Sequence, residues 1–366
     1  MNYSCVIATR NRLEALKLSI PALLGQTRPP QDIIVVDSSD DEAAVRNLIE
    51  EFAALAPLPV RYIRSGPGAA AQRNLGLRHV TGEVVLFPDD DSLLYPDAMD
   101  HIMRVYERDT EGLIGGVCAA EAHAPHESAG IAGASDRPGY RRRRSDAMSL
   151  ALLPLRRWME DRLVPDPFLT LAAQKRTHLR QPDWLDEVKA IHVPYMTGFR
   201  MSFRTEVIRR LQFDEGLGRY ALFEDIDASL RTLDSFCIVA ATQAFIYHHK
   251  APERRDAGRA MGVMHILNRA YVLAKDRSDN PREWDRIQSE ARRFAGYKTL
   301  LYRLRAKSAF ARDRLRGAEL ASADQQKLFN APRHELAATY ARVKELCLRS
   351  PMRENTRVQA TSTSTS

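Results

Sequence analysis

The chain has 366 residues, 44% of them hydrophobic, which suffices for one large domain with an appended unit or for two domains. No apolar run approaches the ~18 residues of a membrane-spanning helix, and the start Met1–Ala8 lacks the basic and apolar regions of a secretory signal. The four cysteines are widely separated, unlike those of a zinc site or a disulfide framework. We therefore expect a cytoplasmic protein with buried, reduced thiols.

The formal net charge of +7 is distributed unevenly along the chain. Residues 1–250 carry 30 Lys and Arg against 34 Asp and Glu, whereas residues 251–350 carry 22 against 12. The basic character therefore belongs to the C-terminal third. Such an excess favours a polyanionic partner, either a nucleic acid or an acidic membrane leaflet.

Strand and helix patterns alternate over the first 120 residues. Short apolar, β-branched runs predict strands, and leucines at helical spacing predict helices between them. This alternation predicts βαβ units and a parallel sheet with right-handed crossovers. We expect strands at Tyr3–Ala8, Asp32–Asp37, Val60–Ile63 and Glu83–Phe87, and helices at Arg12–Leu24, Asp40–Leu55 and Ala69–His79.

The rest of the chain divides into irregular and helical parts. Residues 121–150 are typical of a loop and contain four consecutive arginines, Arg141–Arg144, and residues 190–250 return to strands and short helices. The pattern from Arg254 to about Leu348 is almost entirely helical. We therefore expect an α/β domain over residues 1–250, a basic helical extension over 251–350 and a disordered low-complexity tail over 351–366.

Three aspartates, Asp89, Asp90 and Asp91, closely follow the apolar strand Glu83–Phe87. Adjacent carboxylates repel one another and need water or a cation, and the carboxyl ends of parallel strands line the ligand crevice of an open α/β sheet. Oxygen ligands select Mg²⁺ or Mn²⁺, which in turn bind phosphate oxygens. The run therefore predicts a metal–diphosphate site, with a solvated acidic turn as the alternative.

Polar residues also follow the other predicted strands. Asp37 ends the second strand, where it could accept a hydrogen bond from a pyrimidine N–H, although helix capping is the alternative. Gly66–Gly68 precede a helix that carries Arg73, and free N–H groups with a cation suit a diphosphate. The candidate nucleotide-binding residues are Thr9, Arg10, Asn11, Asp37, Arg73, Asn74, Asp89 and Asp90.

These segments together resemble the family-2 glycosyltransferases of the GT-A fold. The resemblance implies a Rossmann-like nucleotide-binding sheet and inverting transfer from a nucleotide sugar. It also places the metal motif of the family, Asp-x-Asp, on Asp89 and Asp91, and its base-binding aspartate on Asp37. The matching stretches are Cys5–Arg12, Ile33–Asp40, Arg73–Leu77 and Val85–Asp91.

The resemblance continues at Phe223–Arg231, where the family has a Glu-Asp motif at the start of a helix that faces the acceptor. It implies that Asp225 is the general base, with Glu224 and Asp227 as acidic neighbours. Clustered like charges raise one another's pKa, which suits a proton acceptor near neutral pH. The alternative is a helix N-terminus that simply favours acidic residues.

Two further segments complete the candidate site. His248, the first of two histidines after the apolar run Ala244–Tyr247, matches a position where some family members supply a metal ligand. A structural or solvated histidine is the alternative. The segment Tyr195–Arg200 resembles the acceptor-side loop, with Gly198 and Phe199 facing the acceptor.

The basic C-terminal extension contains an amphipathic pattern, with Phe294, Tyr297, Leu301 and Leu304 at helical spacing among many Lys and Arg residues. It indicates either contact with an anionic membrane or packing of the apolar stripe against the catalytic domain.

The sequence thus predicts a metal-dependent inverting glycosyltransferase that uses Mn²⁺ or Mg²⁺ and a UDP- or dTDP-sugar. The acceptor hydroxyl is expected on a bacterial surface glycan or glycolipid, reached from the cytoplasm or the inner membrane face. A sugar-phosphate nucleotidylyltransferase is one alternative, but its glycine-rich phosphate loop is missing from Ala8–Arg12. A nucleic-acid-binding protein is another, but aromatic residues do not interleave with the basic run, so we expect no nucleic acid partner.

Overall fold

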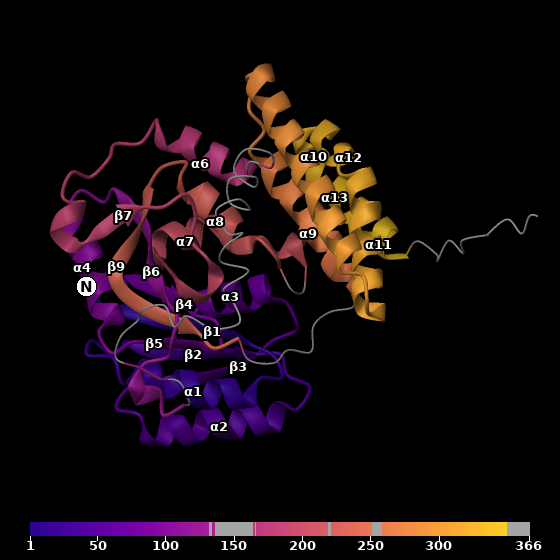
Figure 1. Ribbon diagram of the computed structural model, residues 1–366. Coiled ribbons are helices and arrows are strands. Elements are labelled where there is room, and N and C mark those ends of the chain that lie inside the picture. The colour runs from indigo at the N-terminus through magenta and orange to yellow at the C-terminus, as the bar shows by residue number, and fades with distance from the viewer. Residues whose placement is uncertain (132–133, 136–163, 165, 219–220, 251–257, 350–366) are drawn as a thin grey trace, which may run out of the picture.

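The computed structural model describes residues 1–131, 134–135, 164, 166–218, 221–250 and 258–349. Within these residues one mixed sheet of nine strands forms the centre of an α/β domain. The strand order is β3-β2-β1-β4-β8-β6-β9-β5, and β7 pairs with β9. Helices cover both faces of this sheet, and the C-terminal helices lie together on one side of it (Figure 1). The predicted α/β class with a helical C-terminal extension is therefore confirmed.

The N-terminal half of the sheet has the predicted βαβ organisation. β1 pairs in parallel with β2 and β4, and β2 pairs in parallel with β3, so the carboxyl ends of these strands meet at one edge. The elements are β1 Tyr3–Thr9, α1 Leu13–Leu24, β2 Asp32–Asp37, α2 Glu42–Leu55, β3 Val60–Arg64, α3 Ala69–Leu77 and β4 Val84–Phe87.

Beyond β4 the sheet becomes mixed. β8 runs antiparallel between β4 and β6, and the long strand β9 runs parallel to β6 and antiparallel to β5. The elements here are β5 Ser92–Leu94, α4 Ala98–Arg108, β6 Ile114–Ala122, η1 Glu127–Ala129, α6 Pro167–Arg176, η3 Leu185–Val188, β7 Ala190–His192, η4 Gly198–Arg200, β8 Met201–Arg204, α7 Thr205–Leu211, η5 Glu215–Leu217, α8 Glu224–Thr232 and β9 Cys237–His248.

The hydrophobic core lies on both faces of the sheet. Alternate strand residues contribute to the two faces, as Val6 does to one and Ile7 to the other, which explains the continuous apolar runs of the strands. α3 crosses β1 closely at Gly76, where an added Cβ would lie 2.4 Å from Val6 Cγ1. This close approach packs the last turn of α3 against β1 and β2.

The C-terminal helices share the core of the α/β domain. α9 contributes Val263, Leu267 and Tyr271 to the same cluster as Phe168 of α6 and Val6 of β1. The helices are α9 Gly258–Lys275, α10 Pro281–Leu304, α11 Ala309–Asp324, α12 Gln326–Asn330, η6 Arg333–Glu335 and α13 Leu336–Arg349. Of the helices that the structure describes, none combines the length and apolar character needed to cross a bilayer.

The amphipathic stripe of the extension lies mainly inward. Phe294 stacks on Arg269 of α9, with 3.8 Å between the guanidinium carbon and the ring centre, and Tyr297 and Leu301 are half-buried. Leu304 ends α10 and is exposed, and α11 begins only at Ala309 with Ser308 as its cap. The predicted Arg141–Arg144 run and the tail 351–366 lie outside the described residues.

Candidate active site

A cleft of about 750 Å³ opens at the carboxyl edge of the parallel strands. The loops after β1 and β4, the start of α3, the segment before β8, the start of α8 and the end of β9 all contribute to its lining. It brings together these candidate residues: Thr9, Arg10, Asn11, Arg73, Asp89, Asp90, Gly198, Phe199, Glu224, Asp225 and His248.

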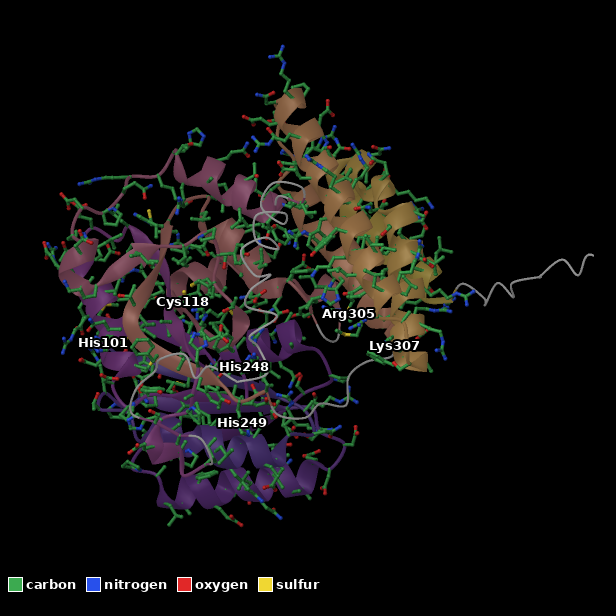
Figure 2. All side chains as sticks on the ribbon, viewed as in Figure 1. His101, Cys118, His248, His249, Arg305 and Lys307 are labelled. Carbon is green, nitrogen blue, oxygen red and sulfur yellow. The ribbon has the colours of Figure 1, made fainter. Side chains whose placement is uncertain are left out.

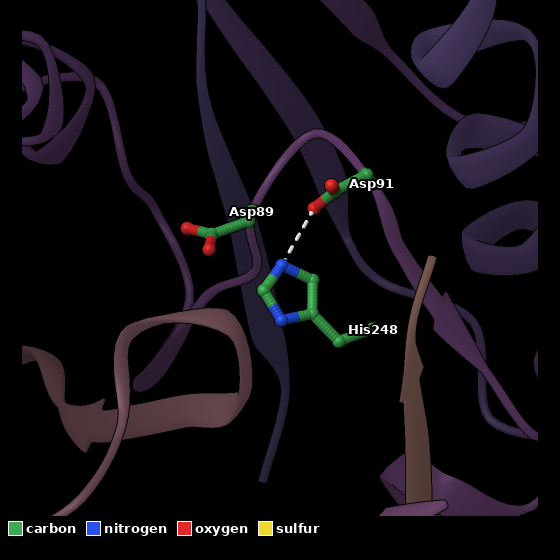
Figure 3. Close-up of side chains that lie close together, drawn as sticks. All are labelled: Asp89, Asp91 and His248. Atoms are coloured by element: carbon green, nitrogen blue, oxygen red, sulfur yellow. Dashed lines mark ion pairs between the residues drawn. The ribbon is translucent and has the colours of Figure 1, made fainter. Parts of the chain in front are cut away.

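Asp89, Asp91 and His248 form a candidate metal centre beside this cleft (Figure 3). Each offers one ligand atom, and these atoms lie within 4.8 Å of one another. The pairing of β5 with β9 sets His248 opposite Ser92, next to the aspartate run, and so brings together residues far apart in sequence. Two carboxylates and an imidazole form a donor set that suits Mn²⁺ and also accepts Mg²⁺, so the residues present fit the predicted ion.

The imidazole of His248 is held from two sides. Its Nε2 lies 3.2 Å from Asp91 Oδ1, and the ring of Phe199 stacks on it with centroids 4.7 Å apart. Burial lowers the pKa of His248, but the contact with Asp91 outweighs this effect and leaves the pKa raised. Phe199, predicted on the acceptor side, therefore also orients a candidate metal ligand.

Arg12 organises the aspartate loop. Its Nη1 donates to Asp90 Oδ1 at 2.8 Å and to Asp91 Oδ2 at 3.0 Å, and Thr9 Oγ1 donates to Asp90 Oδ2 at 2.8 Å. Burial raises the pKa of Asp90 to about 7, although both donors oppose this rise. Asp90 thus ties the loop to β1. Sequence reasoning missed Arg12 as a site residue, although it closes the same matching segment as Thr9.

Two polar residues at the mouth of the cleft link the loops after β1 and β2. Asn11 has φ 57°, a left-handed conformation that asparagine tolerates, and its side chain exchanges two hydrogen bonds of 2.8 Å with Asp40. Arg10 lies 3.5 Å from the same carboxylate. Asp40 therefore holds these loops together, and Asp41 is the residue that caps α2.

Asp37 lies beneath the surface at the end of β2. It is fully buried, and it accepts hydrogen bonds from Ser39 through Oδ1 and from Tyr62 and Arg64 through Oδ2, both at 3.1 Å. Asp37 is not one of the described residues that line the cleft. A base could contact it only after Arg64 or Tyr62 has moved.

Consecutive residues of α3 point in different directions, because successive helical side chains are ~100° apart. Arg73 faces the cleft, where its Nη2 lies 2.8 Å from Asp89 Oδ1 and its Nη1 contacts Glu224. Asn74 instead bonds the backbone of Phe213 with both ends of its amide. Asn74 is therefore directed into the protein interior and does not join the nucleotide-binding residues at the cleft.

Asp225 occupies the other wall of the cleft. Its Oδ2 accepts the N–H of Gly198 and its Oδ1 that of Ile226, both at 2.8 Å. Burial raises the pKa of Asp225, and these backbone donors oppose the rise without cancelling it. A Cβ on Gly198 would lie 3.6 Å from Asp225 Oδ2 and 3.9 Å from Asp89 Oδ1, so Gly198 lies next to both the candidate base and the candidate metal centre.

The acidic neighbours of Asp225 have other partners. Glu224 pairs with Arg73. Burial raises the pKa of Glu224, and the positive charge of Arg73 opposes this rise. Asp227 is buried, bonds Arg231 and Lys275, and does not belong to the described lining of the cleft. The geometry therefore favours Asp225 alone among the three as a group that can reach an acceptor.

The start of α8 is anchored to the C-terminal helices. Phe223, the residue before Glu224, has φ 76°, which is strained for an aromatic residue. The guanidinium of Arg269 stacks against Phe168 and lies near Phe223, at 4.2 and 5.7 Å from their ring centres. Sequence reasoning missed Arg269. The signal that could have revealed it is a single arginine within a long, largely apolar stretch of α9, because arginine is seldom buried without a partner.

Comparisons with known proteins agree with this geometry. The family model "Glycosyl transferase family 2" matches residues 4–149, less than half of the chain. The chain is 30% identical over 108 residues to the uncharacterized glycosyltransferase YwdF of Bacillus subtilis, which is 29% of this chain and 39% of that protein. It is 31% identical over 121 residues to the poly(ribitol-phosphate) β-N-acetylglucosaminyltransferase TarP of Staphylococcus aureus, 32% of this chain and 37% of TarP. The chain thus matches about two fifths of the length of these relatives.

Solved structures extend the likeness beyond the matched segment. The mannosyltransferase PcManGT of Pyrobaculum calidifontis, solved with GDP-Man and Mn²⁺, superposes with a TM-score of 0.50 at 15% identity, over 95% of this chain and 87% of that one. GalNAc-T7, solved with UDP, GalNAc and Mn²⁺, superposes with a TM-score of 0.50 at 14% identity, and the match covers 82% of this chain and 51% of that one. The family model and the curated relatives support a family 2 glycosyltransferase in the N-terminal part of the chain, and these neighbours show that its fold is GT-A.

Proposed function

We propose that this protein is a metal-dependent, inverting glycosyltransferase that moves a sugar from a UDP- or dTDP-sugar to an acceptor hydroxyl. The observation that carries the proposal is one cleft lined by Asp89 and His248, which form the candidate metal centre with Asp91, and by Gly198 and Asp225. This arrangement brings a site for a leaving diphosphate and a proton acceptor into the same cleft.

The residues of the chain divide the chemistry between them. Asp89, Asp91 and His248 would hold Mn²⁺ or Mg²⁺, and the bound ion would supply positive charge to neutralise a leaving diphosphate. Arg73 faces the same space and adds a fixed cation, and Glu224 holds the guanidinium in place. Asp225 takes the proton of the acceptor hydroxyl as that oxygen attacks the anomeric carbon from the face opposite the diphosphate. Attack from that face inverts the anomeric centre.

The acceptor that we propose is a bacterial surface polysaccharide or glycolipid, reached from the cytoplasmic side of the membrane. The support is the sequence match to TarP, whose name gives a poly(ribitol-phosphate) acceptor and an N-acetylglucosaminyl group. The match covers only 37% of TarP, so both donor and acceptor of this chain need their own experiment.

The test is a panel of nucleotide sugars incubated with the purified protein, with Mn²⁺, with Mg²⁺ and with excess EDTA. We expect release of UDP or dTDP from at least one sugar in the presence of metal, and loss of that release with EDTA. Proton NMR of the glycosylated product then reports the anomeric configuration. Release of pyrophosphate from a nucleoside triphosphate and a sugar phosphate would instead identify a nucleotidylyltransferase.

Replacing Asp37 by alanine should weaken UDP or dTDP binding by about 1–3 kcal/mol, the contribution of a charge-assisted hydrogen bond. Loss of the carboxylate removes both the proposed acceptor for the base N–H and the partner that orients Arg64. Calorimetry with UDP measures the effect. Asp32→Ala is the matched control, because Asp32 is buried at the other end of the same strand. An equal loss in both variants, or tighter binding of GDP or CMP by the wild type, would contradict the assignment.

A further inference from the structure

The turn between α10 and α11 carries exposed apolar side chains. Leu300 and Leu304 at the end of α10 are 52% and 69% exposed, and Phe310 at the start of α11 is 39% exposed. Leu300 and Leu304 are four residues apart and so lie on one face of α10. We call residues 300–312 the hairpin tip.

The hairpin tip is also strongly basic. It contains Arg303, Arg305, Lys307 and Arg312 and no acidic residue. Arg303 is neutralised by Glu319 at 2.7 Å, whereas Arg305 and Lys307 extend into solvent at the lower end of the C-terminal helices (Figure 2). The tip therefore combines apolar side chains with an excess of positive charge.

Other helix ends meet at the same place. An added Cβ on Gly258, the first residue of α9, would lie 2.3 Å from the carbonyl oxygen of Phe310, and Arg259 donates to the carbonyl of Leu348 near the end of α13. Leu348 is 38% exposed and so adds a further apolar side chain to this end of the helices. The start of α9 and the end of α13 thus lie beside the hairpin tip.

This end of the helices is close to the cleft along the chain. His248 ends β9 and Gly258 begins α9, and ten residues can span at most ~34 Å. The chain therefore links the candidate metal ligand His248 to this end of the helices within that length.

We propose that the hairpin tip docks on an anionic phospholipid bilayer, with Leu304 and Phe310 at headgroup depth and Arg305 and Lys307 on lipid phosphates. An anionic bilayer can bind both kinds of side chain at the tip, because the apolar side chains leave water and the basic side chains contact lipid phosphates. A nucleic acid would use the charges but leave the leucines and the phenylalanine in water. Docking here is independent of the transfer reaction and can be measured without a substrate.

Flotation with vesicles of phosphatidylglycerol and phosphatidylcholine tests the proposal. The full chain should float with anionic vesicles at low salt, should float less at high salt, and should not float with pure phosphatidylcholine. Arg305→Glu with Lys307→Glu should lower the partition coefficient at least about tenfold, since each basic residue near such a surface contributes roughly fivefold. The matched control is Arg282→Glu with Arg293→Glu, which makes the same charge change at exposed positions of α10 away from the tip.

The apolar contribution has its own pair of variants. Leu304→Ser with Phe310→Ser should reduce flotation, whereas Leu55→Ser with Leu169→Ser, at exposed positions elsewhere, should not. In folded protein, brominated lipids should quench added fluorescence from Phe310→Trp but not from Leu55→Trp. The proposal is overturned if the wild type does not bind anionic vesicles at low salt, if the control charge variant loses as much binding as the tip variant, or if the chain binds a DNA duplex but not vesicles. UDP binding by each variant, measured separately, keeps this result distinct from any failure of the transfer proposal.

Discussion

Replacing Asp91 by asparagine should lower the rate of sugar transfer by at least about 10²-fold while the protein stays folded. Asp91 is 1% exposed, and its carboxylate contacts both His248 and Arg12. Asparagine keeps the size of the side chain but loses the negative charge that attracts the ion. The positive charge of Arg12, which Asp91 now pairs with, then opposes metal binding. Initial rates across a Mn²⁺ titration, with calorimetry of Mn²⁺ binding, measure the effect, and excess EDTA should reproduce it in the wild type.

A variant of a buried aspartate away from the cleft serves as a control, because it distinguishes loss of metal binding from loss of folding stability. Asp109 lies away from the cleft, where its carboxylate pairs with Arg204 at 2.8 Å and accepts the backbone N–H groups of Leu113 and Ile114. Asp109→Asn should lower the melting temperature and leave the rate per folded molecule unchanged. If Asp109→Asn slows transfer as much as Asp91→Asn, or if the wild type is fully active in excess EDTA, the metal assignment is wrong.

The first half of the fold could be read from the sequence because its signals are local. The strands β1, β2 and β4 are largely apolar runs, and β1, β2 and β3 are each followed directly by a helix. Since parallel strands bring their carboxyl ends to one edge, the positions of Thr9 and Asp89 in a common site followed from strand order alone. No long-range contact had to be guessed.

The rest of the site depends on pairing between distant segments. His248 meets the aspartate run only because β9 pairs antiparallel with β5, a register that neither strand specifies by itself. Along one helix the direction of a side chain depends on tertiary packing. Arg73 reaches the cleft while Asn74 bonds Phe213, 139 residues further along the chain. Asp225 lines the cleft, whereas Asp227, two positions on, pairs with charges from α8 and α9.

The contacts of Arg269 link the C-terminal helices to the start of α8. Arg269 comes from α9, pairs with Asp166 at the start of α6, and lies against Phe223, which precedes the candidate base. A guanidinium buried in this way needs both a carboxylate and aromatic faces, because charge is costly away from water. The extension therefore helps to fix the strained backbone at the start of α8. An assignment of residues 1–250 as the whole catalytic unit would leave out this support.

Asp225→Asn should leave UDP binding within about twofold and lower transfer by about 10²–10⁴-fold, the usual contribution of a general base. Asparagine can still accept one of the two N–H groups, from Gly198 or Ile226, that now bond the carboxylate. It cannot take a proton from an acceptor hydroxyl. Calorimetry of UDP with Mn²⁺ and single-turnover transfer measure binding and chemistry separately.

Asp227→Asn is the matched control in the same helix, because Asp227 is buried and paired with Arg231 and Lys275 outside the lining of the cleft. This variant should be less stable but should transfer sugar at nearly the wild-type rate.

The pH dependence of transfer gives a second test of Asp225 as the general base. Burial raises the pKa of Asp225 above its ordinary 3.8, and the base acts only when deprotonated, so kcat/KM should fall as the pH drops through that raised pKa. The acid limb should thus lie above pH ~4 and should be absent from the residual activity of Asp225→Asn. An unchanged limb in that variant would assign the proton acceptor to another group.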